Sequence, residues 1–162
     1  MEHSIGVGLT ILVQHGREQE AADFYSEAFE ARQLKAYRVD GELAGVEMLI
    51  GGTRLSVAGA NPRREEEPAY GGPFFPRAAG AVSMIIQLTV PDIEACFAHA
   101  IVAGATLRDR VQTDVEGRRV ASLFDPFGHI WVLIERQAEI AGVGSDRLVL
   151  QADRPSGLDL QA

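Results

Sequence analysis

Two opposite charges on neighbouring predicted strands form the polar pair best suited to chemistry in this sequence. The Gly51-Gly52 pair between two apolar runs predicts a two-residue hairpin, which places Glu47 and Arg54 diagonally on one face. There Glu47 could act as a general base with a pKa raised by burial, while Arg54 holds an enolate or a carboxylate. In the alternative interpretation, the two charges simply pair with each other.

The histidines and the single cysteine are the other side chains that could bind a metal or act as a nucleophile. His3, His15, His99 and His129 do not converge in the sequence, and no HxH, HExxH or CxxC spacing occurs. Cys96 lies in the apolar stripe of a predicted helix, which favours a buried thiol over a reactive one. We therefore expect no metal, and we expect His129 to order the turn before the last strand.

The composition limits the partners on which these side chains can act. The chain has 162 residues, of which 46% are hydrophobic, and 15 basic against 23 acidic residues give a net charge of −8. No basic excess exists to bind a nucleic-acid backbone, and no apolar run approaches the roughly 20 residues of a membrane span. The sequence also lacks an export signal. We expect a cytoplasmic domain that acts on small molecules, with no nucleic acid and no membrane as partners.

Two stretches of the chain show the same order of predicted elements. Residues 6–59 and 82–136 each predict a strand, a helix and three further strands. We predict one domain over residues 1–136, built from these two β-α-β-β-β modules, and a C-terminal extension over residues 137–162. The linker at residues 60–81 is rich in Pro, Gly and charge, and we expect its aromatic side chains to anchor it onto the sheet.

Alternation along the strands gives each of them two faces. One face is apolar and should pack against a helix, whereas the other is mixed and should line a pocket. The mixed faces of the first and fifth strands hold Thr10, Leu12, Gln14, Ser83, Ile85, Gln87 and Thr89. The hairpin register pairs Ile50 with Thr53, Leu49 with Arg54, Met48 with Leu55 and Glu47 with Ser56.

Two motifs give the sequence a family resemblance. The paired modules, Phe-Tyr-x-x-Ala-Phe at residues 24–29 and Asp-Pro-Phe-Gly-His-Ile-Trp at residues 125–131 resemble the glyoxalase, bleomycin-resistance and extradiol-dioxygenase group, also called the vicinal oxygen chelate superfamily. The resemblance covers about residues 7–136. It implies an α+β fold in which the two modules form a cup-shaped mixed sheet with helices on the convex face. It also implies a homodimer.

The same resemblance locates the positions at which metalloenzymes of the superfamily carry four ligands, usually His and Glu. These positions fall on Thr10, Ser56, Ile85 and Val132 in this sequence. None of the four is a usual ligand for a divalent metal, and the two aliphatic side chains cannot coordinate at all. The departure implies a site without a metal or another cofactor.

We therefore expect a metal-independent protein of the bleomycin-resistance type that sequesters an organic ligand, such as an antibiotic, in its pocket. The predicted lining comprises Thr10, Leu12, Glu47, Arg54, Ser56, Ile85, Gln87, Ile130 and Val132. The acidic chain favours a cationic ligand at long range, whereas Arg54 favours a carboxylate or a phenolate, so the charge of the ligand stays open.

Two other functions remain open at this point. One is an enzyme of the same fold, a lyase, isomerase or dioxygenase, which would use Glu47 as the base or a displaced metal site that includes His15 or His129. The other is a non-catalytic interaction module that binds a protein partner through the C-terminal extension and a sheet edge.

Overall fold

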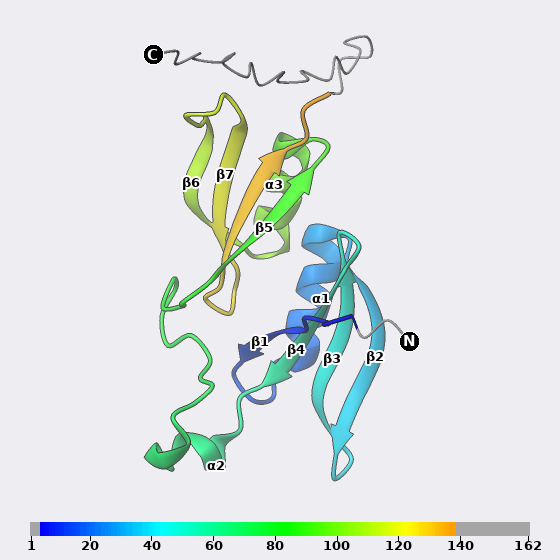
Figure 1. The fold of residues 1–162 in the computed structure, drawn as a ribbon, viewed down its shortest axis with the longest axis vertical. Helices are drawn as coiled ribbons and strands as arrows, with labels where there is room; N and C mark the ends of the chain where they lie inside the picture. The colour runs from blue at the N-terminus through cyan, green and yellow to red at the C-terminus, as the bar shows by residue number, and fades with distance from the viewer. Residues whose placement is uncertain (1–3, 139–162) are drawn as a thin grey trace, which may run out of the picture.

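The computed structural model describes residues 4–138, and it contains the predicted β-α-β-β-β order twice (Figure 1). The first module consists of β1 (Leu9–Val13), α1 (Glu18–Phe29), β2 (Arg32–Val39), β3 (Glu42–Ile50) and β4 (Thr53–Gly59). The second consists of β5 (Ile85–Val90), α3 (Ile93–Ala103), β6 (Thr106–Thr113), β7 (Arg119–Phe124) and β8 (Ile130–Glu135). The linker carries the short helix α2 (Pro62–Glu65) and the 3-10 turn η1 (Pro68–Tyr70). His3 and all but the first two residues of the predicted extension at 137–162 lie outside the described residues.

Each module forms its own mixed sheet. The first sheet has the strand order β1-β4-β3-β2 and the second has the order β5-β8-β7-β6. The pairs β1 with β4 and β5 with β8 are parallel, and the other pairs are antiparallel. The α+β fold class is therefore confirmed. The single cup-shaped sheet is not what the structure shows, because the eight strands divide into two open four-stranded sheets whose edge strands include β1 and β5.

Alternation along the strands decides which side chains the helices cover. Ile11 and Val13 of β1 and Leu55 and Val57 of β4 point toward α1 and are buried. The opposite face of each sheet, here called the helix-free face, carries the mixed residues. In the first sheet these are Thr10, Leu12, Arg32, Lys35, Tyr37, Gly45, Glu47, Leu49, Arg54, Ser56 and Ala58. In the second sheet they are Ile85, Gln87, Thr89, Thr106, Asp109, Gln112, Val120, Ser122, Phe124, Ile130, Val132 and Ile134.

The hairpin between β3 and β4 has the predicted register. Ile50 pairs with Thr53 around the Gly51-Gly52 turn, and Glu47 lies opposite Ser56. Both glycines have positive φ values, 53° and 82°, which explains why this turn uses two residues without a Cβ atom. The turn chemistry therefore determines which side chains share the helix-free face.

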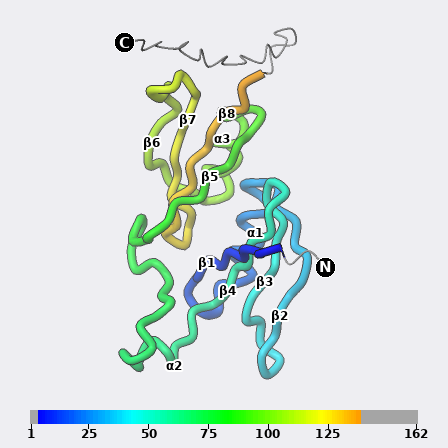
Figure 2. Tube along the Cα trace, viewed as in Figure 1, coloured from blue at the N-terminus to red at the C-terminus, as the bar shows by residue number. Residues whose placement is uncertain are grey.

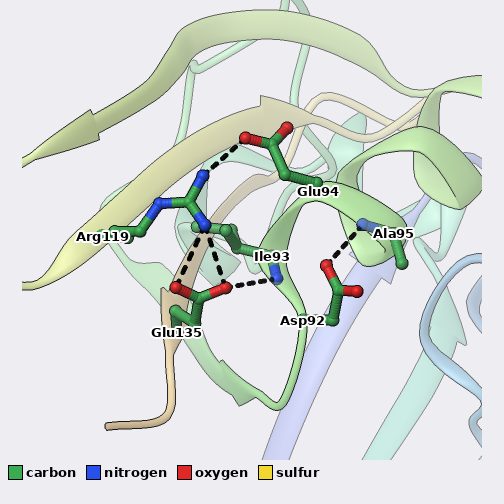
Figure 3. A network of polar contacts seen from close by, with 6 residues as sticks. All are labelled: Asp92, Ile93, Glu94, Ala95, Arg119 and Glu135. Carbon is green, nitrogen blue, oxygen red and sulfur yellow. Dashed lines mark hydrogen bonds and ion pairs between the residues drawn. The ribbon is translucent and has the colours of Figure 1, made fainter.

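A network of charges positions α3 on the second sheet (Figure 3). The side chain of Asp92 accepts a hydrogen bond from the backbone N–H of Ala95 at 3.0 Å, which caps the helix. Glu135 at the end of β8 accepts from the backbone N–H of Ile93 at 3.2 Å and from Arg119 on β7 at 3.2 Å. The start of α3 is therefore tied to two strands at once.

A buried carboxylate joins the two modules. Asp125, in the turn between β7 and β8, is 4% exposed and accepts four hydrogen bonds. Two come from the backbone N–H groups of Phe127 and His129 at 2.9 Å. The other two come from the hydroxyl of Tyr25 on α1 at 2.7 Å and from Nε1 of Trp131 at 2.8 Å. Because α1 belongs to the first module, this one side chain crosslinks both halves of the fold.

The linker runs along one side of the molecule from β4 to β5 (Figure 2). It is anchored at its C-terminal end, where the backbone N–H of Gly80 donates to the carbonyl of Gly128 at 2.9 Å. A Cβ atom at Gly128 would come within 2.7 Å of Pro76, so the linker packs tightly on this turn. The predicted anchoring by aromatic side chains is wrong for Tyr70 and Phe74, which are both exposed. None of the helices in the described residues has the length and apolar character needed to cross a membrane.

Candidate functional site

The first sheet brings several of the predicted pocket residues together. Thr10 on β1 lies opposite Ser56 on β4, and Ser56 lies opposite Glu47 on β3. The three side chains therefore form a row across the helix-free face. Leu12 and Arg54 are on the same face, on opposite sides of this row.

Glu47 forms the centre of a polar cluster on this face. Its carboxylate accepts a hydrogen bond from Arg54 at 2.7 Å and a longer one from the hydroxyl of Tyr37 at 3.3 Å. The ammonium group of Lys35 lies 4.8 Å from the centre of the Tyr37 ring. The side chain of Glu47 is 18% exposed, whereas that of Arg54 is 72% exposed, so the arginine is the outer member of the pair.

These contacts change the prediction for Glu47 as a base. The hydrogen bond from Arg54 outweighs desolvation and lowers the pKa of Glu47, and Tyr37 and Lys35 lower the pKa further. A pKa raised by burial was expected from the sequence, whereas these hydrogen bonds and charges lower it. Because an efficient general base at neutral pH needs a pKa near the working pH, this geometry disfavours Glu47 in that role. The alternative prediction, that the two charges pair with each other, is confirmed.

The second sheet offers a more apolar helix-free face. Ile130 and Val132 on β8 lie on it beside Ile85 and Gln87 on β5. Ile85 is 51% exposed, which leaves much of this apolar surface open. The polar contribution comes from β6 and β7, where the hydroxyl of Ser122 donates to Asp109 and accepts from Arg108 at 3.1 Å.

The register also corrects one of the four positions at which the resemblance implies metal ligands. In the first sheet Thr10 pairs with Ser56, and the equivalent pair of the second sheet is Gln87 with Val132. The equivalence follows from matching hydrogen bonds at the strand ends, from the N–H of Ala60 to the carbonyl of Val13 and from the N–H of Arg136 to the carbonyl of Val90. Ile85 pairs with Ile130 instead, two residues nearer the start of both strands. The fifth-strand position is therefore Gln87 rather than Ile85.

These positions do not fit a divalent transition metal. The corrected set provides two hydroxyls, an amide and an aliphatic side chain, and contains no imidazole, carboxylate or thiolate. Within residues 4–138, no group of three or more His, Cys, Asp and Glu side chains is arranged to hold a metal ion. We therefore derive no chemical step through a metal at this site.

The described histidines have separate roles. His129 orders its turn through its backbone N–H, as predicted, and its Nε2 also lies 2.8 Å from the carbonyl of Leu12 on β1. His15 follows β1, where its Nδ1 lies 3.3 Å from Oε1 of Glu18. Glu18 is only 2% exposed, a burial that the charged start of α1 did not predict. His15 and His129 lie on different loops and do not converge on Glu47.

A pocket of about 560 Å³ lies where β5 meets the first sheet. It includes Ile85 and Gln87 from the predicted lining, together with Leu9, Leu55 and Trp131. Cys96 lies beside a smaller crevice near the start of α3, and burial raises the pKa of its thiol, which agrees with an unreactive cysteine.

Two functional candidates were missed by the sequence analysis. Lys35 and Tyr37 lie on β2, where irregularities between Gln33 and Lys35 and between Tyr37 and Arg38 break the alternation. No simple period-two pattern could place these side chains on the helix-free face. The one signal available in the sequence was Tyr37, an aromatic residue among the basic residues of β2.

Comparisons with known proteins agree on one family. The model of the Glyoxalase/Bleomycin resistance protein/Dioxygenase superfamily matches residues 10–133. An uncharacterized protein of Mycobacterium bovis is 32% identical over 121 residues, which cover 74% of this chain and 77% of that protein.

Solved structures with the same fold come from distant organisms. A gene product from Arabidopsis thaliana matches with a TM-score of 0.63 at 23% identity, over 82% of this chain and 99% of that one. A fosfomycin resistance protein from Listeria monocytogenes, solved with Mn(II) and a dihydroxypropylphosphonic acid, matches with a TM-score of 0.55 at 14% identity, over 83% of this chain and 90% of that one. Identities this low show a shared fold alone.

Proposed function

The chain belongs to the glyoxalase/bleomycin resistance protein/dioxygenase superfamily, and within it we propose a metal-independent protein that binds and sequesters a small organic ligand. The observation that carries this proposal is the register of the two equivalent strand pairs. Thr10 pairs with Ser56 and Gln87 with Val132, and these pairs, where the resemblance implies the ligands of the metalloenzymes, offer no imidazole and no carboxylate. Such side chains suit the recognition of an organic molecule instead.

The surroundings of these pairs support the same function. The helix-free face of the second sheet is largely aliphatic around Val132, and that of the first sheet carries hydroxyls and charges around Ser56. Apolar surface with a few polar anchors is what a drug-sized molecule requires. An antibiotic is one such molecule. The Listeria protein of the same fold is a resistance protein solved with Mn(II), whereas the described residues of the present chain contain no group of three or more His, Cys, Asp and Glu side chains arranged to hold a metal ion.

The binding site is completed by a second copy of the chain in this proposal. Ile85 and Met84 at the start of β5 and Leu9 on β1 expose apolar surface along the open edges of the two sheets. Burying this surface between two copies would remove it from water and enclose a ligand. Light scattering on the eluting protein should give the mass of a dimer, and Ile85→Asp should shift it to a monomer. Val102→Asp, at an exposed apolar position on α3, is the matched control. A monomer in the unmodified protein contradicts this part of the proposal.

The first experiment measures metal affinity. Protein purified without a chelator or a tag is analysed for metal content and then titrated calorimetrically with nickel, zinc, manganese and iron(II). We expect no stoichiometric binding. Thr10→His combined with Ser56→Glu places an imidazole beside a carboxylate on the paired positions, and serves as a positive control for Ni²⁺. One tightly bound metal per chain in the unmodified protein would overturn metal independence and favour an enzyme of this fold.

The enzymatic alternative is tested at Glu47. If Glu47 were a general base, Glu47→Gln would abolish any turnover found for the purified protein and leave its fold intact. We expect no turnover that depends on Glu47, because the hydrogen bond from Arg54 lowers the pKa of its carboxylate and so makes it a weaker base.

A further inference from the structure

The helix-free face of the first sheet carries more positive charge than its chain would suggest. The register places Lys35 opposite Glu47, and both Arg32 and Arg54 opposite Leu49, so all three cations share this face. In the part of this face that surrounds Glu47, formed by residues 9–13, 32–37, 45–50 and 53–59, Glu47 is the one carboxylate. Three cations therefore stand against one anion in a chain whose net charge is −8.

Arg54 is the member of this set with the most unused capacity for hydrogen bonding. One of its N–H groups donates to Glu47, and no other side-chain partner occurs within the described residues. A guanidinium group has five N–H donors in a planar arrangement that matches a carboxylate or a sulfonate. Since the side chain is 72% exposed, its remaining donors face the solvent above Glu47.

Glu47 shows how this face holds an acidic group. Its two carboxylate oxygens are divided between Arg54 and the hydroxyl of Tyr37, with Lys35 close by. These donors stabilise the ionised form of a carboxylate, as the lowered pKa of Glu47 reflects. A ligand carrying its own acidic group would meet the outer donors of the same cluster.

Apolar groups lie next to these charges. Leu49 lies opposite Arg54, and Leu12 and Ala58 lie on the other side of the row formed by Glu47, Ser56 and Thr10. A purely inorganic anion would gain nothing from them, whereas the body of an organic anion would bury apolar area against them. Charge complementarity and apolar surface therefore favour one class of occupant.

We infer that the ligand is an amphiphilic organic anion, whose carboxylate or sulfonate is received by Arg54 and Lys35 and whose apolar body lies against Leu49 and extends toward Leu12. This inference rests on the proposed binding function and adds the chemical class of the ligand. It also gives Glu47 a role, which is to orient Arg54 and to compete with the incoming anion.

The test uses two fluorescent dyes that differ in one group. 8-Anilinonaphthalene-1-sulfonate carries a sulfonate, and N-phenyl-1-naphthylamine has the same rings without it. Both are titrated against the full chain and against Arg54→Gln, with Arg63→Gln on the exposed surface of α2 as a control of equal charge. Circular dichroism and the melting temperature establish that each variant is folded.

We expect Arg54→Gln to weaken the binding of the sulfonate dye by about fivefold to tenfold, the usual size of one charge-assisted hydrogen bond at a partly exposed site. The neutral dye should change by less than about twofold, and Arg63→Gln should leave both affinities unchanged. Glu47→Gln removes the competing carboxylate and should tighten binding of the sulfonate dye by about threefold.

The outcomes distinguish a wrong ligand class from a wrong binding function. If both dyes bind and Arg54→Gln weakens neither, the assigned anion class is wrong while the binding function stands. If neither dye binds to the folded protein, the binding function itself is contradicted and the inference falls with it. Selective loss of the sulfonate dye in Arg54→Gln, together with tighter binding in Glu47→Gln, supports both.

Discussion

Replacing Asp125, which connects the two modules, with asparagine should lower the unfolding free energy more than the same substitution of a surface aspartate. Oδ1 of Asp125 accepts from two backbone N–H groups of its own turn, and an asparagine oxygen can keep both bonds. Oδ2 accepts from Tyr25 and Trp131, and an amide NH₂ takes its place in the variant. The hydroxyl of Tyr25 can reverse its role, but the indole N–H of Trp131 is a donor only.

The expected cost follows from this change of partners. Trp131 is fully buried, so water cannot satisfy its indole N–H after the substitution. Losing a hydrogen bond to a charged group and leaving a buried donor unpaired should cost about 3 kcal/mol of unfolding free energy, or about 6–12 °C in melting temperature. Tyr25→Phe removes one bond and leaves the bond from Trp131 in place, so it should cost about 1.5 kcal/mol.

Urea unfolding followed by the fluorescence of Trp131, the single tryptophan of the chain, measures both effects. Asp23→Asn on the exposed side of α1 is the matched control and should change the unfolding free energy by less than about 0.5 kcal/mol. Because Tyr25 and Trp131 share one oxygen atom, the double variant Tyr25→Phe/Asp125→Asn should cost less than the sum of the single variants. A cost for Asp125→Asn no larger than that of Asp23→Asn would refute this account of the joint.

Three further outcomes are expected. Burial, followed by the neighbouring Asp125, raises the pKa of Tyr25 well above 10, so the folded chain keeps a proton that the unfolded chain releases. The unfolding free energy measured in urea should therefore fall by about 1.4 kcal/mol per pH unit above pH 10. Tyr25→Phe should remove that slope. Gly59→Ala should cost about 1–3 kcal/mol because the new Cβ atom overlaps Oε1 of Glu18, and calorimetric melting should show the loss reduced when Glu18→Ala is added. Glu30 ends α1 with a φ of 56°, a left-handed conformation that favours glycine, so Glu30→Gly should raise the unfolding free energy by about 0.5–1 kcal/mol in the same urea assay; no gain would mean that the conformation carries no strain.

Short-range patterns were sufficient to predict most of the fold. The Gly51-Gly52 pair gave the hairpin register, and through it the diagonal contact between Glu47 and Arg54. Alternation placed Thr10 on the helix-free face, because a strand with one buried side has little freedom in its register.

Interactions over long sequence distances could not be predicted in the same way. The turn motif indicated that Asp125 matters, yet its contact with Tyr25 depends on how the modules pack. The pKa of Glu47 is lowered chiefly by the hydrogen bond from Arg54, which outweighs burial, and then by Tyr37 and Lys35, whose faces are decided by irregularities in β2. The division into two open sheets likewise depends on β1 and β5 being edge strands. The sequence of a single strand does not show whether that strand lies at an edge.

The joint at Asp125 has a consequence for synthesis of the chain on the ribosome. The hydroxyl of Tyr25 and its acceptor are separated by 100 residues, and translation proceeds at about 5–20 residues per second. For several seconds the first module exists with a phenol directed at a partner that has not yet been made. The hydrogen bond that ties α1 to the second module can therefore form only after the turn between β7 and β8 has been synthesised.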